Sequence, residues 1–422
     1  MRDKLLSYCD VVRGVSYSPY DLRDSYKSNM FYLLRSNNIK EGKLVFKDVQ
    51  IVDDNCVSSA QKLEKNDIAV CMSNGSKRLV GKSAQFKGST NNFCVGAFCA
   101  GFRPGINSEP NYIYQLFQSR EYQKYIDVTL AGSAINNLKG GDILNFEFDF
   151  PPLPQQQKIA NILSTCDEVI EKTEAAIAKY QALKQGLMHD LFTRGIDLKT
   201  GKLRPTYHDA PEFYKQSELG MVPKDWEIDE LTNLTKLVTD GSHFSPVPQE
   251  KGMPIGNVKD MIDGTFNYAN CTKILPEVFE LLVRQNCSPI FGDVLLSKDG
   301  TIGKVIHFID DKRIVLLSSI AIIRVNELID SEYLSWTLQS EFFDKALYSL
   351  LSGSALKRIT LKDIQKIKIP FSKSLKEQKV ISMRIESIQE KIQTEQQTLA
   401  KYQQLKAGLM QDLLTGKVEV KV

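Results

Sequence analysis

The sequence predicts a duplicated α/β or α+β fold. It comprises two similar globular domains and two long antiparallel coiled-coil helices, related by a pseudo-two-fold internal repeat. Three observations predict it. The segment KYQALKQGLMHDLFT, from Lys179, returns as KYQQLKAGLMQDLLT from Lys401, at an offset of 222 residues. Each copy ends a long stretch with apolar residues in heptad spacing. Short apolar runs of strand character, closed by glycine turns, precede each stretch.

The repeat divides the 422 residues into six segments. Each globular segment is long enough to bury its own core. The segment between the first helix and the second domain is polar and punctuated by proline and glycine, as a linker is. In chain order the expected segments are a first domain at 1–152, a helix at 153–195, the linker at 196–225, a second domain at 226–373, a helix at 374–416 and a tail at 417–422.

The repeat also reaches into the globular domains. Residues 131–150, AGSAINNLKGGDILNFEFDF, align with residues 352–371, SGSALKRITLKDIQKIKIPF. NDIAVCMSNG at 66–75 resembles GDVLLSKDG at 292–300, and each is an apolar strand closed by a glycine turn. The stretches between these anchors differ. A shared scaffold with divergent loops is what two domains that recognise different targets would need.

Both long helices carry an apolar seam with alternating steps of three and four residues. In the first helix the seam comprises Ile159, Ile162, Cys166, Val169, Thr173, Ala176, Tyr180, Leu183 and Leu187. In the second it comprises Ile381, Ile385, Ile388, Ile392, Leu399, Tyr402, Leu405 and Leu409, with Glu395 as a polar interruption. We expect the seams to bury each other, because matched seams in one chain have a high effective concentration for each other. The alternatives are packing of each helix on its own domain and pairing with another molecule.

The helix ends carry start and stop signals. Pro154 suits the first helical position, and Ser374 with Glu377 forms a capping-box pattern. Gly195 and Gly416 follow the last apolar residues, where a helix stop often needs a positive φ.

Composition favours a cytoplasmic globular protein and does not by itself indicate nucleic-acid binding. The net charge is only +3, whereas nucleic-acid-binding domains are usually strongly basic. No apolar run approaches the roughly 18 residues of a membrane span, and the start MRDKLLSYCD lacks the apolar core of a secretory signal. The eight cysteines form no Cys-x-x-Cys pair, so reduced and mostly buried thiols are expected.

Three motifs suggest catalysis and fall short of it. Residues 75–83, GSKRLVGKS, resemble a phosphate loop, but five residues separate the glycines where the motif has four. Residues 149–154, DFPPLP, suggest an Asp-Pro-Pro catalytic loop, but a phenylalanine separates the aspartate from the prolines. A rigid entry to the following helix is the better interpretation of this segment. The four histidines are scattered without metal spacing at His189, His208, His243 and His307. We therefore expect no catalytic residue and no metal in this chain.

The function that remains is binding of a ligand through the stretches that differ between the two domains. Arginine and lysine suit guanine edges or phosphates, and asparagine suits adenine. The candidates in the first domain are Arg35, Asn37, Asn38, Lys77, Arg78 and Lys82. The candidates in the second domain are Asp240, Ser242, His243, Asn257, Lys259, Lys298, Thr301, Lys304, Lys357 and Arg358. Any one of them could be a solvated surface residue, and their recurrence in both halves is the stronger indication.

A series of segments resembles the specificity subunits of Type I restriction-modification systems, and the resemblance covers nearly the whole chain. Each segment alone is a modest match, and their order makes the set specific. The segments are PPLPQQQKIANIL, KYQALKQGLMHDLFTRGIDLKTGKLR, SELGMVPKDWEIDELTNLTKLVTDGSH, GDVLLSKDGTIGKV, GSALKRITLKDIQKIKIP, KEQKVISMRIESIQEKI and the second GLMQDLLTG.

The resemblance implies two target-recognition domains, each of which reads one part of a split double-stranded DNA sequence in the major groove. It implies that the helices set the unread spacer and that the seam residues pair the helices or dock partners. Two modification subunits would methylate adenine with S-adenosylmethionine, and restriction subunits would use ATP and Mg for translocation and cleavage. This chain would bind no cofactor and would not be catalytic.

Two departures from the family pattern affect the first domain. It lacks the PKDW lead-in that precedes Leu231, and the resemblance implies that the carboxy-terminal tail completes this edge. It also has VCMSNGSKRLVGK where the second domain has LLSKDGTIGK, so site residues do not transfer there. Two other functions stay open at this point: a nuclease or methyltransferase in its own right, and a coiled-coil interaction protein unrelated to DNA.

Overall fold

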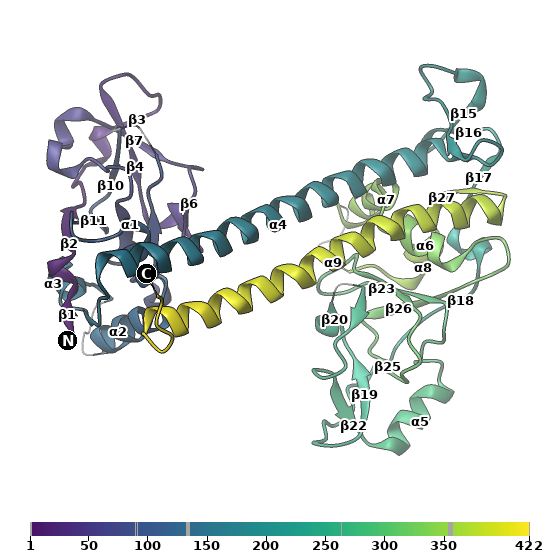
Figure 1. Ribbon diagram of the computed structural model, residues 1–422. Helices are drawn as coiled ribbons and strands as arrows, with labels where there is room; N and C mark the ends of the chain where they lie inside the picture. Colours follow the sequence, from purple (N-terminus) through teal and green to yellow (C-terminus); the bar gives the residue numbers. More distant parts are fainter. Residues whose placement is uncertain are drawn as a thin grey trace. The chain divides into compact units, whose positions relative to one another are not determined.

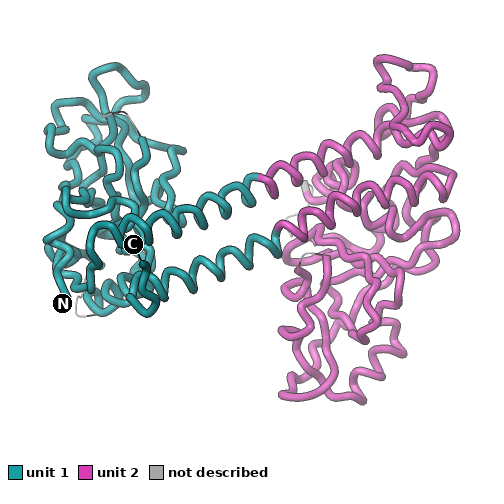
Figure 2. The backbone as a smooth tube through the Cα atoms, viewed as in Figure 1, with its two compact units in different colours: residues 1–175, 396–422 teal, residues 176–395 magenta. Residues whose placement is uncertain are grey.

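The computed structural model describes residues 2–88, 90, 92–131, 136–262, 264–352 and 358–421. These form two compact units (Figure 2): unit 1 comprises residues 1–175 and 396–422, and unit 2 comprises residues 176–395. The unit boundaries fall inside the two long helices, which therefore contribute to both units. The Gly-Ser-Ala positions of the predicted repeat, 132–134 and 353–355, lie outside the described residues.

Unit 1 contains two four-stranded sheets, with strand orders β2-β11-β8-β9 and β10-β4-β7-β3. Its α-helices are α1 (Pro110–Phe117), α2 (Arg120–Ala131), α3 (Gly140–Leu144), the first part of α4 (Leu153–Arg194) and the last part of α9 (Leu375–Leu414). Its strands are β1 (Asp3–Lys4), β2 (Cys9–Arg13), β3 (Leu22–Arg23), β4 (Met30–Leu34), β5 (Ile39–Lys40), β6 (Lys43–Leu44), β7 (Gln50–Asp53), β8 (Ile68–Cys71), β9 (Ser83–Gln85), β10 (Phe93–Val95), β11 (Cys99–Pro104) and β12 (Glu147–Phe148).

Unit 2 repeats this plan with sheets of order β18-β26-β23-β24 and β22-β19-β25. Its α-helices are the last part of α4, α5 (Pro276–Arg284), α6 (Ser331–Thr337), α7 (Glu341–Ser352), α8 (Leu361–Gln365) and the first part of α9. Its strands are β13 (Ile196–Asp197), β14 (Lys202–Leu203), β15 (Tyr214–Ser217), β16 (Gly220–Pro223), β17 (Trp226–Glu230), β18 (Thr235–Asp240), β19 (Met253–Gly256), β20 (Met261–Ile262), β21 (Thr265–Phe266), β22 (Thr272–Ile274), β23 (Asp293–Ser297), β24 (Val305–Phe308), β25 (Val315–Leu316), β26 (Ile320–Val325) and β27 (Lys368–Ser372).

A buried ion pair recurs at the same place in both units. In unit 1 the Arg103 guanidinium donates two hydrogen bonds, of 2.9 and 2.8 Å, to the Asp67 carboxylate. In unit 2 the Arg324 guanidinium donates two hydrogen bonds, both of 2.8 Å, to the Asp293 carboxylate. Both aspartates are fully buried at the start of the inner strands β8 and β23. A buried carboxylate is tolerated because a bidentate guanidinium compensates it. The alignment of residues 66–75 with 292–300 is therefore confirmed in three dimensions.

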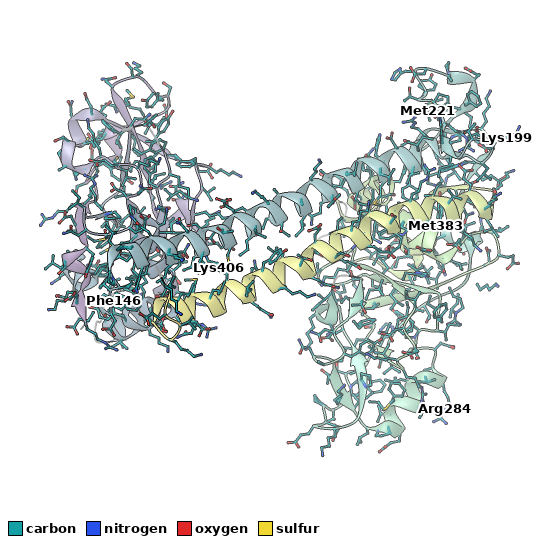
Figure 3. All side chains as sticks on the ribbon, in the orientation of Figure 1. Phe146, Lys199, Met221, Arg284, Met383 and Lys406 are labelled. Atoms are coloured by element: carbon teal, nitrogen blue, oxygen red, sulfur yellow. The ribbon has the colours of Figure 1, made fainter. Side chains whose placement is uncertain are left out.

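The two long helices, α4 and α9 (Figure 1), make side-chain contacts with each other within each unit. In unit 1, Lys406 near the end of α9 (Figure 3) lies 2.6 Å from the Asp167 carboxylate near the beginning of α4. In unit 2, Lys184 near the end of α4 donates to Gln389 Oε1 near the beginning of α9, at 2.8 Å. The pairing is antiparallel in each unit, and the two polar contacts occupy equivalent positions of the repeat.

The buried face of α4 differs from the predicted seam by one residue over much of its length. Leu183 is 53% exposed, and Ile162, Val169, Tyr180 and Leu187 are only half-buried. Apolar residues occupy adjacent heptad positions in this helix, so spacing alone leaves its register open by one residue. The helix uses the later position because it packs on α9 and on its own globular domain. The residues that it buries are Gln156, Ile159, Ala160, Leu163, Ile170, Thr173, Ile177, Met188, Leu191 and Phe192.

The predicted seam of α9 is buried in unit 2 and largely turns outward in unit 1. Ile381, Ile385 and Ile392 are buried, whereas Ile388 and Leu409 are half-buried. Two further seam residues face solvent on this chain, Tyr402 at 36% and Leu405 at 55% exposure. The helix-pairing prediction is wrong for these two and for Leu183. Their docking to a partner stays a prediction.

Both long helices are followed by glycine in the left-handed conformation, with φ of 65° at Gly195 and 69° at Gly416, as predicted. Pro154 is the second residue of α4, which begins at Leu153. Among the described residues, no helix has an apolar stretch long enough to cross a membrane.

The linker is structured and is fixed to the start of α9 through the buried carboxylate of Glu377. This carboxylate accepts hydrogen bonds from Arg204 at 2.5 Å, from the Ile196 amide at 2.7 Å and from the Trp226 indole at 3.3 Å. Only one half of the predicted capping box forms, since Ser374 Oγ accepts from the Glu377 amide at 3.4 Å. The side chain of Glu377 is committed to the linker, which explains why it does not return to Ser374.

Candidate nucleic-acid interface

In both units, the loop that follows the inner strand meets the turn that precedes the neighbouring strand. In unit 1 the Met72 amide donates to the Phe98 carbonyl at 2.8 Å, and in unit 2 the Lys298 amide donates to the Ser319 carbonyl at 2.9 Å. The same frame therefore presents different side chains in the two units. We call this surface the loop edge, which comprises residues 13–15, 72–78, 96–98 and 136–137 of unit 1 and residues 240–244, 298–301, 317–319 and 358 of unit 2.

The loop edge of unit 2 holds a chain of charged contacts. The buried ammonium of Lys298 lies 3.0 Å from Asp240 Oδ2, and the exposed ring of His243 lies 3.1 Å from Asp240 Oδ1. The exposed Arg358 lies 3.9 Å from the carboxylate of the half-buried Asp299. The exposed side chains of His243 and Arg358 thus lie around the buried ion pair of Lys298 and Asp240.

The loop edge of unit 1 is more openly basic. Lys77 and Arg78 lie in the short helix η6 (Lys77–Leu79), are exposed, and form no ion pair with a described residue. The Asn74 amide reaches the adjoining turn and donates to Ser36 Oγ at 3.2 Å. Free cationic side chains beside a rigid turn are suited to phosphate contacts.

Two predicted contact residues, Lys82 and Lys304, have an internal role. The ammonium of each donates to two backbone carbonyls at the end of a short helix, η3 (Ser36–Asn38) for Lys82 and η9 (Val258–Asp260) for Lys304. Burial lowers the pKa of the Lys82 ammonium. These bonds give both lysines a structural role and use two of the three N–H groups of each ammonium, and contact of either lysine with DNA stays a prediction.

Four further candidates have buried side chains, which argues against direct contact with DNA. Asn38 is fully buried and donates to the carbonyls of Val45 and Lys47 at 2.9 and 3.0 Å. Asp240 and Lys298 neutralise each other, and the buried Ser242 hydroxyl donates to the Phe244 carbonyl at 2.8 Å. Polar side chains of this kind stabilise the loop edge and present no head group to a ligand.

The remaining candidates keep their role as predictions. Arg35 and Asn257 are half-buried, and Lys357 lies outside the described residues. The exposed candidates are Asn37, Lys77 and Arg78 of unit 1 and His243, Lys259, Thr301 and Arg358 of unit 2.

Three loop-edge residues were missed from the sequence. Arg13 occupies in unit 1 the register position that Asp240 occupies in unit 2, since they pair with Ala100 and Ala321 respectively. Phe98 is 70% exposed at the position equivalent to Ser319, and Phe244 is 49% exposed beside His243. Extending the repeat alignment through the strand before each loop would have aligned Arg13 with Asp240.

Comparison with known proteins decides the family. The model of the Type I restriction modification DNA specificity domain matches residues 23–179 and again residues 223–404, which is more than half of the chain. The chain belongs to this Type I DNA specificity family. The two matches also coincide with the two halves of the internal repeat.

Relatives of this specificity-family chain are specificity subunits. It is 27% identical over 321 residues to the Type I restriction enzyme MjaVIII specificity subunit of Methanocaldococcus jannaschii, covering 73% of this chain and 71% of that one. It is 34% identical over 180 residues to the StySPI specificity subunit of Salmonella potsdam, covering 42% of this chain and 38% of that one. The crystal structure of the S subunit from M. genitalium shares the fold, with a TM-score of 0.58 at 15% identity over 98% of this chain and 96% of that one.

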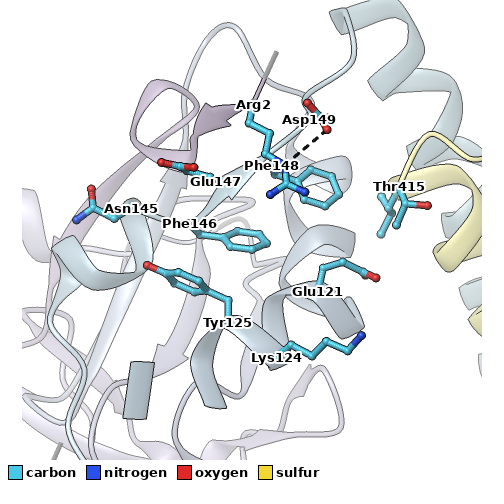
Figure 4. A pocket seen from close by; sticks show the side chains of 11 residues that line it. Arg2, Glu121, Lys124, Tyr125, Asn145, Phe146, Glu147, Phe148, Asp149 and Thr415 are labelled. Atoms are coloured by element: carbon cyan, nitrogen blue, oxygen red, sulfur yellow. Dashed lines mark ion pairs between the residues drawn. The ribbon is translucent and has the colours of Figure 1, made fainter. Parts of the chain in front are cut away.

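Potential metal ligands, thiols and cavities of the specificity-family chain were also located among its described residues. No group of three or more His, Cys, Asp or Glu side chains there could hold a metal ion. All eight cysteines are free thiols, and six are buried. In unit 1, Arg2 and Asp149 line a cavity of about 570 Å³ (Figure 4). They form an ion pair in which Arg2 Nε lies 3.9 Å from Asp149 Oδ2. Its described lining mixes charges of both signs with Phe146 and Tyr125 and contains no histidine or cysteine.

Replacing His307 with glutamine is expected to flatten the pH dependence of unit 2 stability. Burial lowers the pKa of His307 from its usual value of about 6.5. The unfolded chain then takes up the proton first, so stability is lost as pH falls below about 6.5, by up to about 1.4 kcal/mol per pH unit until the folded pKa is reached. Unit 1 carries Gln85 at the equivalent position, so glutamine fits this strand.

The measurement is urea unfolding at pH 7.5 and 5.5, followed by tryptophan fluorescence. Both tryptophans of the chain, Trp226 and Trp336, lie in unit 2 and report on it. An equal loss of stability on acidification in the variant and in the original chain would show that His307 does not contribute.

Proposed function

We propose that this chain is the DNA-reading subunit of a Type I restriction-modification complex and that each unit reads one half of a bipartite double-stranded DNA target. The observation that carries the proposal is the loop edge, where one backbone frame occurs twice with different exposed side chains. Lys77 and Arg78 project from it in unit 1, and His243 and Arg358 project from it in unit 2. Two copies of one frame suit one DNA geometry, and different side chains suit different sequences.

The chemistry of the exposed candidates supports the division of labour between affinity and specificity. Lysine and arginine heads neutralise phosphates and set the position on the duplex. Arg78, Asn37 and Arg358 have the planar donor and acceptor groups that read guanine and adenine edges in the major groove. The net charge of +3 is small for a DNA-binding protein, so we propose that partner subunits supply further positive surface.

We further propose that two modification subunits dock on the repeated helix faces and that the helices set the length of the unread spacer. Leu183 and Leu405 support this docking, because they occupy equivalent positions of the repeat and are 53% and 55% exposed. Exposed leucines at two equivalent places suit two copies of one partner. In this proposal S-adenosylmethionine binds the modification subunits, and ATP and Mg bind the restriction subunits.

Exchanging residues 1–150 for the corresponding region of a relative with another target tests the proposal. The hybrid chain is assembled with modification subunits, and the adenines that it methylates are mapped by sequencing. We expect one half of the methylated motif to change and the other half and the spacer to stay the same. The matched control exchanges residues 226–373 and should change only the opposite half. A change in both halves, or in neither, would contradict the proposal.

A further inference from the structure

Unit 2 contains an acidic cavity that the proposed DNA contacts do not use. It has a volume of about 940 Å³ and lies between α4, α9, α6, strand β24 and the β20–β21 hairpin. Four carboxylates and one ammonium contribute charge to its described lining. They belong to Glu332, Glu386, Asp310, Asp311 and Lys184. The cavity therefore carries a surplus of negative charge within a partly desolvated space.

In unit 1 a lysine of the chain itself occupies the equivalent place. Lys43, the first residue of β6, lies 3.3 Å from the Glu171 carboxylate and 3.0 Å from that of Glu174, both on α4. The Tyr114 hydroxyl of α1 donates to the Gly42 carbonyl at 3.1 Å and closes the hairpin against the helix. Unit 1 thus shows how this architecture accommodates a cation between the hairpin and the long helix.

Smaller side chains leave the place open in unit 2. Thr265, the first residue of β21, stands where unit 1 has Lys43, and Ser335, the fifth residue of α6, stands where α1 has Tyr114. Both line the cavity. Gln393 stands where unit 1 has Glu171, so unit 2 lacks both the internal lysine and this partner, and the negative charge of its cavity comes from other carboxylates.

The cavity also holds a buried donor that lacks a partner. The Trp336 indole is buried, and its N–H makes no hydrogen bond of normal geometry with a described residue, although it is near enough to moderate the Glu332 pKa. Lys184 Nζ lies 4.3 Å from the centre of the Trp336 ring. Buried N–H groups are normally paired, so an acceptor better placed than the Glu332 carboxylate would stabilise this one.

Burial disfavours the charged forms of the cavity groups. It raises the pKa of Glu332 and of Glu386 and lowers the pKa of Lys184. A second cation placed between the two carboxylates would relieve their mutual repulsion.

We propose that this cavity binds an arginine-bearing segment of the modification subunit that docks beside unit 2. The inference rests on the proposed function and names one contact of its partner. The guanidinium lies between the Glu332 and Glu386 carboxylates, and a backbone carbonyl of the same segment accepts from the Trp336 indole. Arginine suits the site better than lysine, because its planar fork binds carboxylates in pairs and stacks on aromatic faces.

Fluorine NMR of the chain labelled with 5-fluorotryptophan tests the site directly, because its two tryptophans give two resonances. The first probe is the blocked tripeptide Gly-Arg-Gly, with Gly-Gln-Gly as its control. We expect the arginine peptide to shift the Trp336 resonance and to leave that of Trp226 in place, and we expect no shift from the glutamine peptide. The double variant E332Q/E386Q should lose the shift, as should Thr265→Lys, which restores the internal lysine of unit 1. An unchanged Trp226 resonance in each variant shows that unit 2 is folded.

The second arm uses the modification subunit itself. We expect it to shift the Trp336 resonance of the original chain, and we expect E332Q/E386Q to weaken assembly by at least about tenfold. Assembly of the variant at full strength with an unmoved Trp336 resonance would overturn the inference and leave the proposed function standing. Equal shifts with both tripeptides would also overturn it, since the cavity would not select a cation. Failure of the original chain to assemble would overturn the proposed function together with this contact.

Discussion

Replacing Glu377 with alanine is expected to lower the free energy of unfolding of unit 2 by about 3–5 kcal/mol, the usual effect of breaking a buried ion pair. The carboxylate is fully buried and is the shared acceptor for Arg204, the Ile196 amide and the Trp226 indole. Alanine would leave a guanidinium and two N–H groups without this acceptor in the interior. The effect is large because one carboxylate fixes the linker, strand β17 and the first turn of α9 together.

Urea unfolding followed by tryptophan fluorescence measures this effect, since both tryptophans lie in unit 2. Glu377→Gln should lose less stability, because its amide oxygen still accepts a hydrogen bond while the charge opposite Arg204 is lost. The matched control is Ser387→Ala at an exposed position of the same helix, where the change should stay within about 0.5 kcal/mol. A Glu377→Ala variant as stable as this control would refute the proposed role of the carboxylate.

Replacing Lys298 with methionine is expected to destabilise unit 2 by about 3 kcal/mol, because it leaves the Asp240 carboxylate buried without its ammonium. Unit 1 carries Met72 at the equivalent position, so methionine fits the loop edge. The double variant K298M/D240N removes both charges and should recover most of the loss. Denaturation of the three proteins under one set of conditions gives the coupling between the two side chains.

The same variants distinguish a structural lysine from a DNA contact. If Lys298 is internal, the stable double variant should keep the target and the salt dependence of DNA binding in the assembled complex. If Lys298 instead contacts a phosphate, the double variant should bind all sequences more weakly, with a salt slope smaller by about 1. The second result would show that the buried pair opens when DNA binds.

The sequence predicted the fold well where the signal was long or was repeated. Two copies of one helix motif established the duplication, and Gly195 and Gly416 marked the helix ends within one or two residues. It did not determine which heptad position of α4 faces inward. Apolar residues at neighbouring positions, such as Ile162 and Leu163, satisfy the same spacing, and only packing on two neighbours selects the second.

The sequence pointed to the loops of the candidate surface, but it did not show which of their residues the fold buries. The loops around His243 and Arg358 lie together at one edge, as their recurrence in both halves suggested. Lys82, Lys298 and Lys304 were assigned to DNA because a sequence does not show what an ammonium meets in the fold. Each of them binds a carbonyl or a carboxylate of its own unit. A lysine in a short loop beside a buried strand can therefore stabilise the fold as readily as it can bind a ligand.

The account depends most on the claim that each unit reads one half of a split DNA target. Mapping of methylated adenines in DNA modified by the complex assembled around this chain tests that claim most directly. The account predicts two defined blocks of bases separated by an undefined spacer of constant length. One continuous block, or a spacer of variable length, would contradict it.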